Sequence, residues 1–169
     1  AMADDGAHGD GAAGDGVYGA VIPAAASAPG QMVRYAIVAT DTEGREMRSP
    51  PFVDPANSPQ YRGTVVYTPA LATNRLPVLH WFIPVPGAAD SDTPARCSVF
   101  FNDRFYDNIG VTIHGQSTRG FPKKSYDFDF NPGDHFRWSA DAPAVDDFNL
   151  LTTWADKSHL RSPLAYEIY

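Results

Sequence analysis

The part of the chain best suited to chemistry is a pair of adjacent lysines, Lys123 and Lys124, that follows a polar turn bounded by glycines. Residues 109–130 read IGVTIHGQSTRGFPKKSYDFDF, which is an apolar strand pattern, a turn from Gly115 to Gly120 and a second alternating pattern. A flexible turn beside a lysine fixed on a strand is a recurring arrangement for holding phosphate. We therefore expect this stretch to bind a phosphate group.

Two other motifs fit the same stretch poorly. The nucleophile elbow G-x-S-x-G requires a second glycine where Arg119 stands, and it leads into a helix. The phosphate loop G-x-x-x-x-G-K-[ST] requires its lysine directly after Gly120, and it must also open a helix. Residues 124–130 instead alternate in polarity, which predicts a strand. Both motifs are therefore excluded.

The same alternation points the two lysines in opposite directions. Lys124 shares a face of the predicted strand with Tyr126, Phe128 and Phe130, so it points inward, whereas Lys123 points outward with the acidic residues. An inward ammonium group is costly unless an anion pairs with it. We expect that anion to be a ligand phosphate or an acidic side chain on a following helix. The alternative is an ordinary charge cluster at the start of a strand.

Two ordered motifs in the second half of the chain resemble the CotH kinase family of spore-coat-protein-H-like atypical kinases. The first is G-x-S-[ST]-R-x-x-P-K-K-S-[YF], present as GQSTRGFPKKSY, and the second is L-L-x-x-W-x-D-K-S-x-x-R, present as LLTTWADKSHLR. The resemblance covers approximately residues 76–169. It implies a kinase-like fold that binds ATP with Mg or Mn and phosphorylates serine or threonine of proteins.

The resemblance also implies roles for particular residues. The turn that faces the nucleotide would contain Gln116, Ser117, Thr118 and Arg119. Lys124 would contact phosphate, with Lys123 as the second candidate. Asp156 would cap a C-terminal helix, and Glu167 on that helix would be the acidic partner of Lys124, although a plain surface charge explains Glu167 equally well. Residues Leu150, Leu151 and Trp154 resemble core residues.

Kinases place the catalytic and metal-binding aspartates in a C-terminal lobe, and we expect such a lobe to follow residue 169 in a longer protein. We therefore predict no catalytic residue and no metal ligand in this chain, and we expect it to be inactive by itself. The competing hypothesis is a non-catalytic spore-coat or cell-surface protein that keeps the kinase-like fold and binds partners.

The first third of the chain has a different character. Residues 1–16 contain three Asp-Gly pairs whose spacing does not match a calcium loop, so a turn-rich connector is expected. Strands are predicted at 17–22, 32–39 and 45–48, the last two as a hairpin. This pattern resembles part of an immunoglobulin-like or fibronectin type III-like sandwich of secreted bacterial proteins. A spacer role is favoured over adhesion, for instance to carbohydrate.

Composition sets the remaining limits. The 169 residues carry a net charge of −7 and a sequence pI near 5.0, which argues against nucleic-acid binding. No apolar run is long enough for a membrane span. We predict an α+β fold class: a partial β-sandwich at 1–55, a Pro-rich linker at 56–75 containing a short strand at 61–67, and at 76–169 an antiparallel kinase-like N-lobe ending in a helix. The expected partners are a nucleotide and a protein substrate, and the expected location is secreted or on the bacterial surface.

Overall fold

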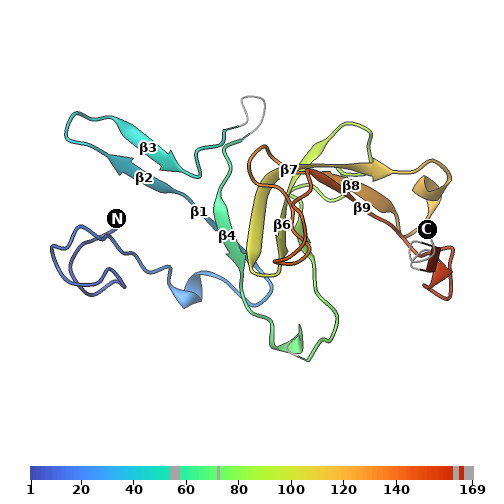
Figure 1. The fold of residues 1–169 in the computed structure, drawn as a ribbon, viewed down its shortest axis with the longest axis horizontal. Helices are drawn as coiled ribbons and strands as arrows, with labels where there is room; N and C mark the ends of the chain where they lie inside the picture. The colour runs from blue at the N-terminus through green and yellow to red at the C-terminus, as the bar shows by residue number, and fades with distance from the viewer. Residues whose placement is uncertain (54–57, 72, 162–163, 166–169) are drawn as a thin grey trace.

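The structure, a computed structural model, describes residues 1–53, 58–71, 73–161 and 164–165. Within these ranges the chain is mostly β-structure, arranged as two two-stranded sheets and one five-stranded sheet, all antiparallel. The small sheets and the large sheet follow one another along the long axis of the molecule (Figure 1). The described residues include three short 3-10 helices: η1 (Ala24–Ala26) before the first strand, and η2 (Pro69–Leu71) and η3 (Ser117–Gly120) between later strands.

The two small sheets divide a segment for which the sequence predicts one strand. Strand β1 (Met32–Tyr35) pairs with β4 (Arg62–Val65), whereas β2 (Ile37–Thr40) pairs with β3 (Glu46–Ser49). The prediction of one continuous strand over 32–39 is therefore wrong, because the chain breaks at Ala36 and each half takes a different partner. Strand β4 falls inside the predicted linker, at the place where a short strand was expected.

The five-stranded sheet has the order β5-β6-β7-β8-β9. Its strands are β5 (His80–Phe82), β6 (Ala95–Phe101), β7 (Arg104–His114), β8 (Ser125–Asp129) and β9 (Asp147–Leu150). The pair Asn102-Asp103 between two strand-like segments predicts a tight hairpin turn, and the structure confirms it, since both residues have positive φ, at 46° and 60°. Two such residues form the turn that matches the twist of paired strands. The long strand β7 is thereby placed at the centre of the sheet.

A bulge interrupts the pairing of β6 with β7. The register passes from Cys97 opposite Ile109 to Val99 opposite Tyr106, so β7 contains one extra residue. The extra residue changes which face the side chains occupy, as bulges commonly do. Asp107 and Asn108, with a φ of 53° at Asn108, are buried polar residues at this point. The bulge therefore places a carboxylate inside the molecule.

Aromatic and branched side chains on one face of the large sheet form the core. Val99, Tyr106 and Phe128 have no exposed surface, and Trp81 packs edge-on against Phe128 with ring centroids 5.3 Å apart. Phe136, from the segment between β8 and β9, covers the same face and contacts the rings of Tyr106, Phe130 and Phe148. Full burial of one such side chain contributes about 1.5–3 kcal/mol. This core fixes the start of β8, where Lys124 lies.

The β1-β4 sheet packs on β7 of the large sheet. A Cβ at Gly63 would lie 2.5 Å from the ring of Phe105, so only glycine fits there. The Arg34 guanidinium contacts the Asp107 carboxylate at 2.8 Å, which joins the two sheets by an ion pair. The predicted domain limits stay a prediction, and the structure adds that residues 58–65 contact both parts.

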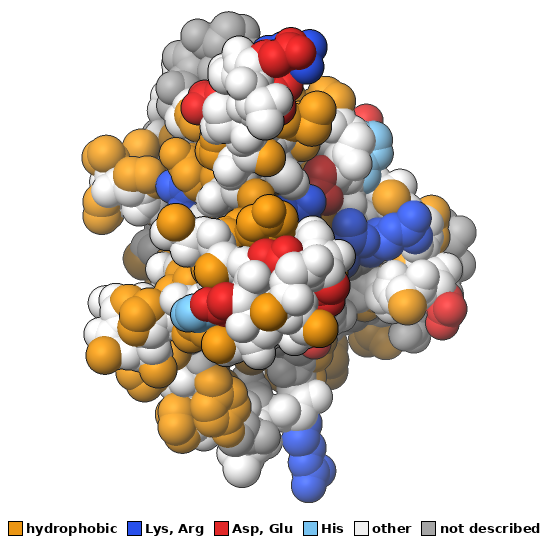
Figure 2. Space-filling model, turned by 90° about the vertical axis from the view of Figure 1, so that its left-hand side faces the viewer, with side chains coloured by type: hydrophobic (Ala, Val, Ile, Leu, Met, Phe, Trp, Pro, Cys, Tyr) orange, Lys and Arg blue, Asp and Glu red, His pale blue; other side chains and the backbone are white. Residues whose placement is uncertain are grey.

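The first turns of the chain are held by aspartate side chains that accept hydrogen bonds from backbone amides. The buried Asp10 accepts from the amides of Asp5, Gly6 and His8, so its carboxylate holds these turns together. The prediction of a strand at 17–22 is wrong, because the structure shows only the bridge between Ala3 and Gly19 there. Hydrophobic side chains are exposed at several places on the face shown in Figure 2. The exposed hydrophobic residues of the first part of the chain include Val17, Tyr18, Val21, Val38 and Met47.

The last part of the described chain departs from the sequence prediction in two ways. Strand β9 was not predicted, and Leu150, Leu151 and Trp154 are 40–42% exposed, so their assignment to the core is wrong. The predicted C-terminal helix lies largely outside the described residues, which show one helical hydrogen bond, from the Leu164 amide to the Leu160 carbonyl. Within the described ranges, no helix has the length and apolar character needed to cross a membrane.

Candidate functional site

The predicted phosphate-binding turn is the direct continuation of the central strand β7. Gly115 ends this strand with a φ of 84°, a value that favours glycine, and η3 follows at once. A Cβ at Gly115 would lie 2.5 Å from Thr118 Oγ1, so a larger residue would also require the Thr118 side chain to move. Strand β8 then returns beside β7 with His114 opposite Ser125. The turn is therefore fixed at both ends by the sheet.

A second loop contacts this turn from the side. The connection between β5 and β6 is anchored by Ala89, which is 2% exposed within the core, and by a 3.1 Å hydrogen bond from the Ile113 amide to the Ser91 carbonyl. The two aspartates that flank Ser91, Asp90 and Asp92, carry carboxylates that reach the turn. The β5-β6 loop is thus the acidic wall of the candidate site.

Lys124 is half-buried and paired with Asp90. Its ammonium group donates to Asp90 Oδ2, and Tyr126 donates its hydroxyl to Asp90 Oδ1 at 3.0 Å. The side chains of Lys124 and Asp90 are 26% and 32% exposed. An ammonium group has three donors, so one bond to Asp90 leaves Lys124 able to bind a further anion. We expected a phosphate or a helix glutamate as the partner, and the structure shows a loop aspartate.

Arg119 is held more completely than Lys124. Its Nε donates to the Gly115 carbonyl, while Nη1 and Nη2 donate to the two oxygens of Asp92 at 2.9 and 2.6 Å. This two-pronged contact is the geometry in which guanidinium binds carboxylate or phosphate. The Asp92 side chain is 77% exposed, so the pair lies at the surface. Arg119 therefore shapes the turn and also presents an anion-binding fork.

The other predicted residues take less defined positions. Gln116, Ser117 and Lys123 are exposed, and Thr118 Oγ1 lies 3.5 Å from the His114 carbonyl. Glu167, the predicted helix partner of Lys124, lies outside the described residues. The difference between the half-buried Lys124 and the exposed Lys123 agrees with the alternation of the sequence.

Ion pairs and burial in the candidate site shift the pKa values of its acidic groups. The hydrogen bond from Lys124 lowers the pKa of Asp90, and the hydrogen bond from Arg119 lowers the pKa of Asp92. Burial, followed by the hydrogen bond to Asp90, raises the pKa of the Tyr126 hydroxyl to about 12. Both carboxylates are therefore charged at neutral pH, and Tyr126 remains a hydrogen-bond donor. Two cations and two carboxylates leave these four side chains with no net charge.

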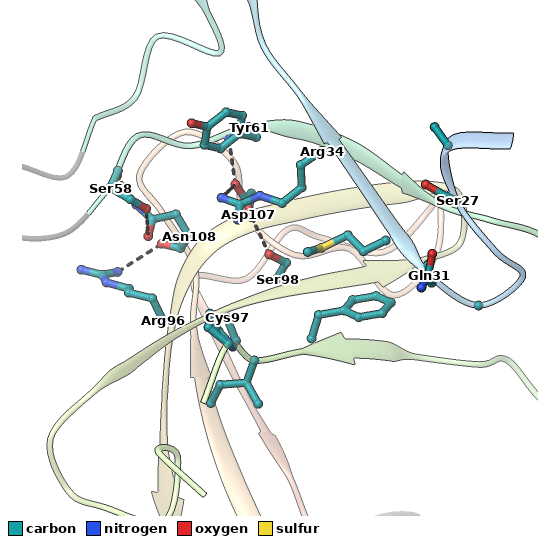
Figure 3. A pocket seen from close by; sticks show the side chains of 16 residues that line it. Ser27, Gln31, Arg34, Ser58, Tyr61, Arg96, Cys97, Ser98, Asp107 and Asn108 are labelled. Atoms are coloured by element: carbon teal, nitrogen blue, oxygen red, sulfur yellow. Dashed lines mark hydrogen bonds and ion pairs between the residues drawn. The ribbon is translucent and has the colours of Figure 1, made fainter. Parts of the chain in front are cut away.

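A cavity of about 1020 Å³ lies elsewhere, where β1 and the segment just before β4 meet the large sheet (Figure 3). Its buried carboxylate, Asp107, accepts from the Arg34 guanidinium, the Tyr61 amide and the Ser98 hydroxyl. The Tyr61 ring lies below the guanidinium groups of Arg34 and Arg48, with distances of 4.5 and 4.8 Å to its centroid. These contacts satisfy the carboxylate internally. We therefore interpret the contacts of Asp107 as a structural link between the β1-β4 sheet and the large sheet.

Asp90 and Asp92 were not singled out from the sequence. The only signal was an Asp-Ser-Asp triplet inside a loop rich in proline, glycine and aspartate, which resembles many solvated loops. For metal ions, no group of three or more histidine, cysteine or acidic side chains in the described ranges could act as ligands. The single cysteine, Cys97, is buried on β6, and burial raises its pKa to about 12.

Together the fold and the site define a β-rich chain in which small N-terminal sheets precede an antiparallel sheet with a lysine-bearing turn. Comparison with known families agrees with this division. Residues 111–169 match the family described as CotH kinase protein, and residues 1–49 match the second Ig-like domain of conditioned medium factor. Two separate parts of the chain are thus similar to these two families, in the order expected, which confirms the resemblance recognised from its motifs. No curated protein and no solved structure matches the chain.

Proposed function

We propose that the turn from Gly115 to Gly120 and Lys124 form the nucleotide phosphate-binding part of a CotH-like protein kinase. The observation that carries this proposal is the position of Lys124, half-buried at the start of β8 beside the turn, inside the segment that matches the CotH family. A lysine held in this way can donate to a phosphate without a large loss of side-chain freedom. On the same grounds we propose a kinase-like N-lobe, completed by a helix, for this part of the chain.

Phosphoryl transfer also needs catalytic and metal-binding aspartates. We propose this activity, directed at serine or threonine of a protein, for a longer protein that includes this segment, with ATP and Mg or Mn as its cofactors. The described residues offer no metal-binding group, so we derive no step through the metal. The Ig-like match supports a further proposal, that the protein is secreted or displayed on a bacterial surface or spore coat.

The test is calorimetric titration of the 169-residue chain with MgATP, comparing Lys124→Ala with Lys123→Ala as the matched control. A hydrogen bond to a charged group contributes about 1.5–3 kcal/mol, so Lys124→Ala should weaken binding by about 10-fold to 100-fold. Lys123→Ala should change the affinity by less than about threefold, because the exposed Lys123 has the weaker surface interactions. Equal binding by Lys124→Ala and the wild type would refute the proposal.

A second candidate function has one observation in its favour. The carboxylates of Asp90 and Asp92 neutralise the two cations, which is also what a purely structural surface protein requires. That alternative is a non-catalytic spore-coat or cell-surface binding protein with a kinase-like fold. It predicts no heat of binding with MgATP and no rise in melting temperature at millimolar nucleotide.

A further inference from the structure

The Asp92 carboxylate lies where a phosphate group would bind Arg119. We propose that Arg119 is a second phosphate-binding residue that Asp92 masks in the ligand-free protein and that a polyphosphate unmasks by exchange. This inference rests on the proposed function. It adds to that function a residue, Asp92, that limits phosphate affinity by competing for Arg119. It separates the two acidic residues of the β5-β6 loop, Asp90 and Asp92, into a fixed group and a displaceable one.

The first step is the geometry of the Arg119 fork. Nη1 and Nη2 each donate to one oxygen of Asp92, at 2.9 and 2.6 Å. The third contact, from Nε to the Gly115 carbonyl, belongs to the turn itself and holds the guanidinium plane in place. Two oxygens of a phosphate accept from the same pair of nitrogens in the same arrangement. The carboxylate thus occupies the position that a phosphate would take.

The second step is the contrast between the two aspartates. Asp90 is two-thirds buried and is held by both Lys124 and the Tyr126 hydroxyl. The Asp92 side chain is 77% exposed, and its carboxylate is held by Arg119. Surface ion pairs contribute little net stability because water and salt compete with them. Asp92 can therefore leave Arg119 at small cost, whereas Asp90 stays with Lys124.

The third step is proximity. Two residues of extended chain span at most about 7 Å, so Asp90 and Asp92 hold Lys124 and Arg119 on one small patch. A polyphosphate bound to the free donors of Lys124 would bring its next phosphate near Arg119. When a phosphate replaces the Asp92 carboxylate, Arg119 keeps an anionic partner and Asp92 moves into solvent. Binding at Lys124 then favours unmasking at Arg119.

The test uses inorganic pyrophosphate as the probe and Asp92→Asn as the variant, measured by calorimetric titration at low ionic strength. Loss of the competing charge should raise pyrophosphate affinity about fivefold, the scale expected for one exposed charge at contact distance. The gain should disappear in the double variant Asp92→Asn, Arg119→Gln, and amide spectra should show that every variant keeps the fold. Asp103→Asn, an exposed aspartate in the β6-β7 turn at the opposite end of β7 from Gly115, is the matched control for the loss of one negative charge, and it should leave the affinity within about twofold.

Each outcome has a defined meaning. Unchanged or weaker pyrophosphate binding by Asp92→Asn would overturn the inference and identify the Arg119–Asp92 pair as a fixed structural clamp. A gain that persists in the double variant would overturn it as well, because Arg119 would not be the residue unmasked. Failure of the proposed function gives a different pattern: pyrophosphate binding would survive Lys124→Ala, or neither the wild type nor any variant would bind.

Discussion

Replacement of Asp107 by alanine is the perturbation for which the structure gives the clearest consequence. The carboxylate is 1% exposed and accepts from the Arg34 guanidinium, from the Tyr61 amide at 2.8 Å and from the Ser98 hydroxyl. Alanine removes all three acceptor contacts at once. The guanidinium of Arg34, whose side chain is 32% exposed, then loses its counter-charge at the joint between the β1-β4 sheet and β7.

The magnitude follows from the burial of these groups. Loss of one partner of a buried ion pair costs about 3–5 kcal/mol, and a donor left unsatisfied adds about 1–3 kcal/mol. The partial exposure of Arg34 allows water to replace part of the lost contact, so the total cost should lie at the lower end of the sum of these two values. We expect Asp107→Ala to lower the free energy of unfolding by about 3–5 kcal/mol. For a chain of this length the melting temperature should fall by about 10 °C.

Urea unfolding read by two probes tests this expectation. The three tryptophans, at 81, 138 and 154, all follow the β1-β4 sheet in the sequence, so their fluorescence reports on the C-terminal part, whereas far-UV circular dichroism reports on the whole chain. In Asp107→Ala the dichroism transition should begin at lower urea than the fluorescence transition. Asp129→Ala, an exposed aspartate on β8, is the control and should stay within about 0.5 kcal/mol. A cost below about 1 kcal/mol for Asp107→Ala would refute the reasoning.

Three further predictions concern single residues. Gly115→Ala should lower stability by about 1–3 kcal/mol in thermal unfolding, because a φ of 84° strains a residue with a Cβ and the Thr118 hydroxyl would have to move; an unchanged melting temperature would contradict this. Cys97, whose pKa is raised to about 12, should react with a thiol reagent at pH 8 only after unfolding, and stability should fall as pH rises from 9 toward 12, since the unfolded thiol ionises first. The pKa of Asp156 is lowered to about 2, chiefly by the hydrogen bond from Ser158, so its stabilising contribution exists above pH 3.8 and is lost as pH falls toward 2. Hydrogen exchange of the Arg161 amide, which donates to Asp156, should accelerate over that window in the wild type and should be fast throughout in Asp156→Asn.

The features that the sequence predicted correctly depend on local chemistry. The turn at Asn102 and Asp103 follows from two residues that tolerate positive φ between alternating strands. The difference between the exposed Lys123 and the half-buried Lys124, which directly precede β8, follows the two-residue alternation that continues into this strand. In both cases the residues that decide the structure are neighbours in the chain.

The features that the sequence missed depend on partners far along the chain. The break at Ala36 exists because β1 pairs with β4 and β2 pairs with β3, and neither pairing is visible in the alternation of 32–39. Strand β9 forms because Phe148 lies opposite Phe128 across the sheet. Residues 17–22 have strand-like composition but, within the described chain, pair only through one bridge at Gly19.

In the candidate site, too, the sequence predicted the local features and missed those that depend on distant residues. The turn and its lysine were found because their residues are contiguous and match a family motif. The carboxylates were missed because Asp90 is 34 residues from Lys124 and Asp92 is 27 residues from Arg119. Only the docking of the β5-β6 loop on β7, through the Ile113 amide, brings these charges together.

The central claim is that nucleotide phosphate binds at the turn beside Lys124. Amide chemical shifts of the isotope-labelled 169-residue chain, recorded during titration with MgATP, test it most directly because they locate the ligand. The account predicts that the largest shifts fall at residues 115–120 and at Lys124, and that Lys124→Ala abolishes them. Shifts centred on the cavity around Arg34 and Asp107, or an unchanged spectrum at saturating nucleotide, would contradict it.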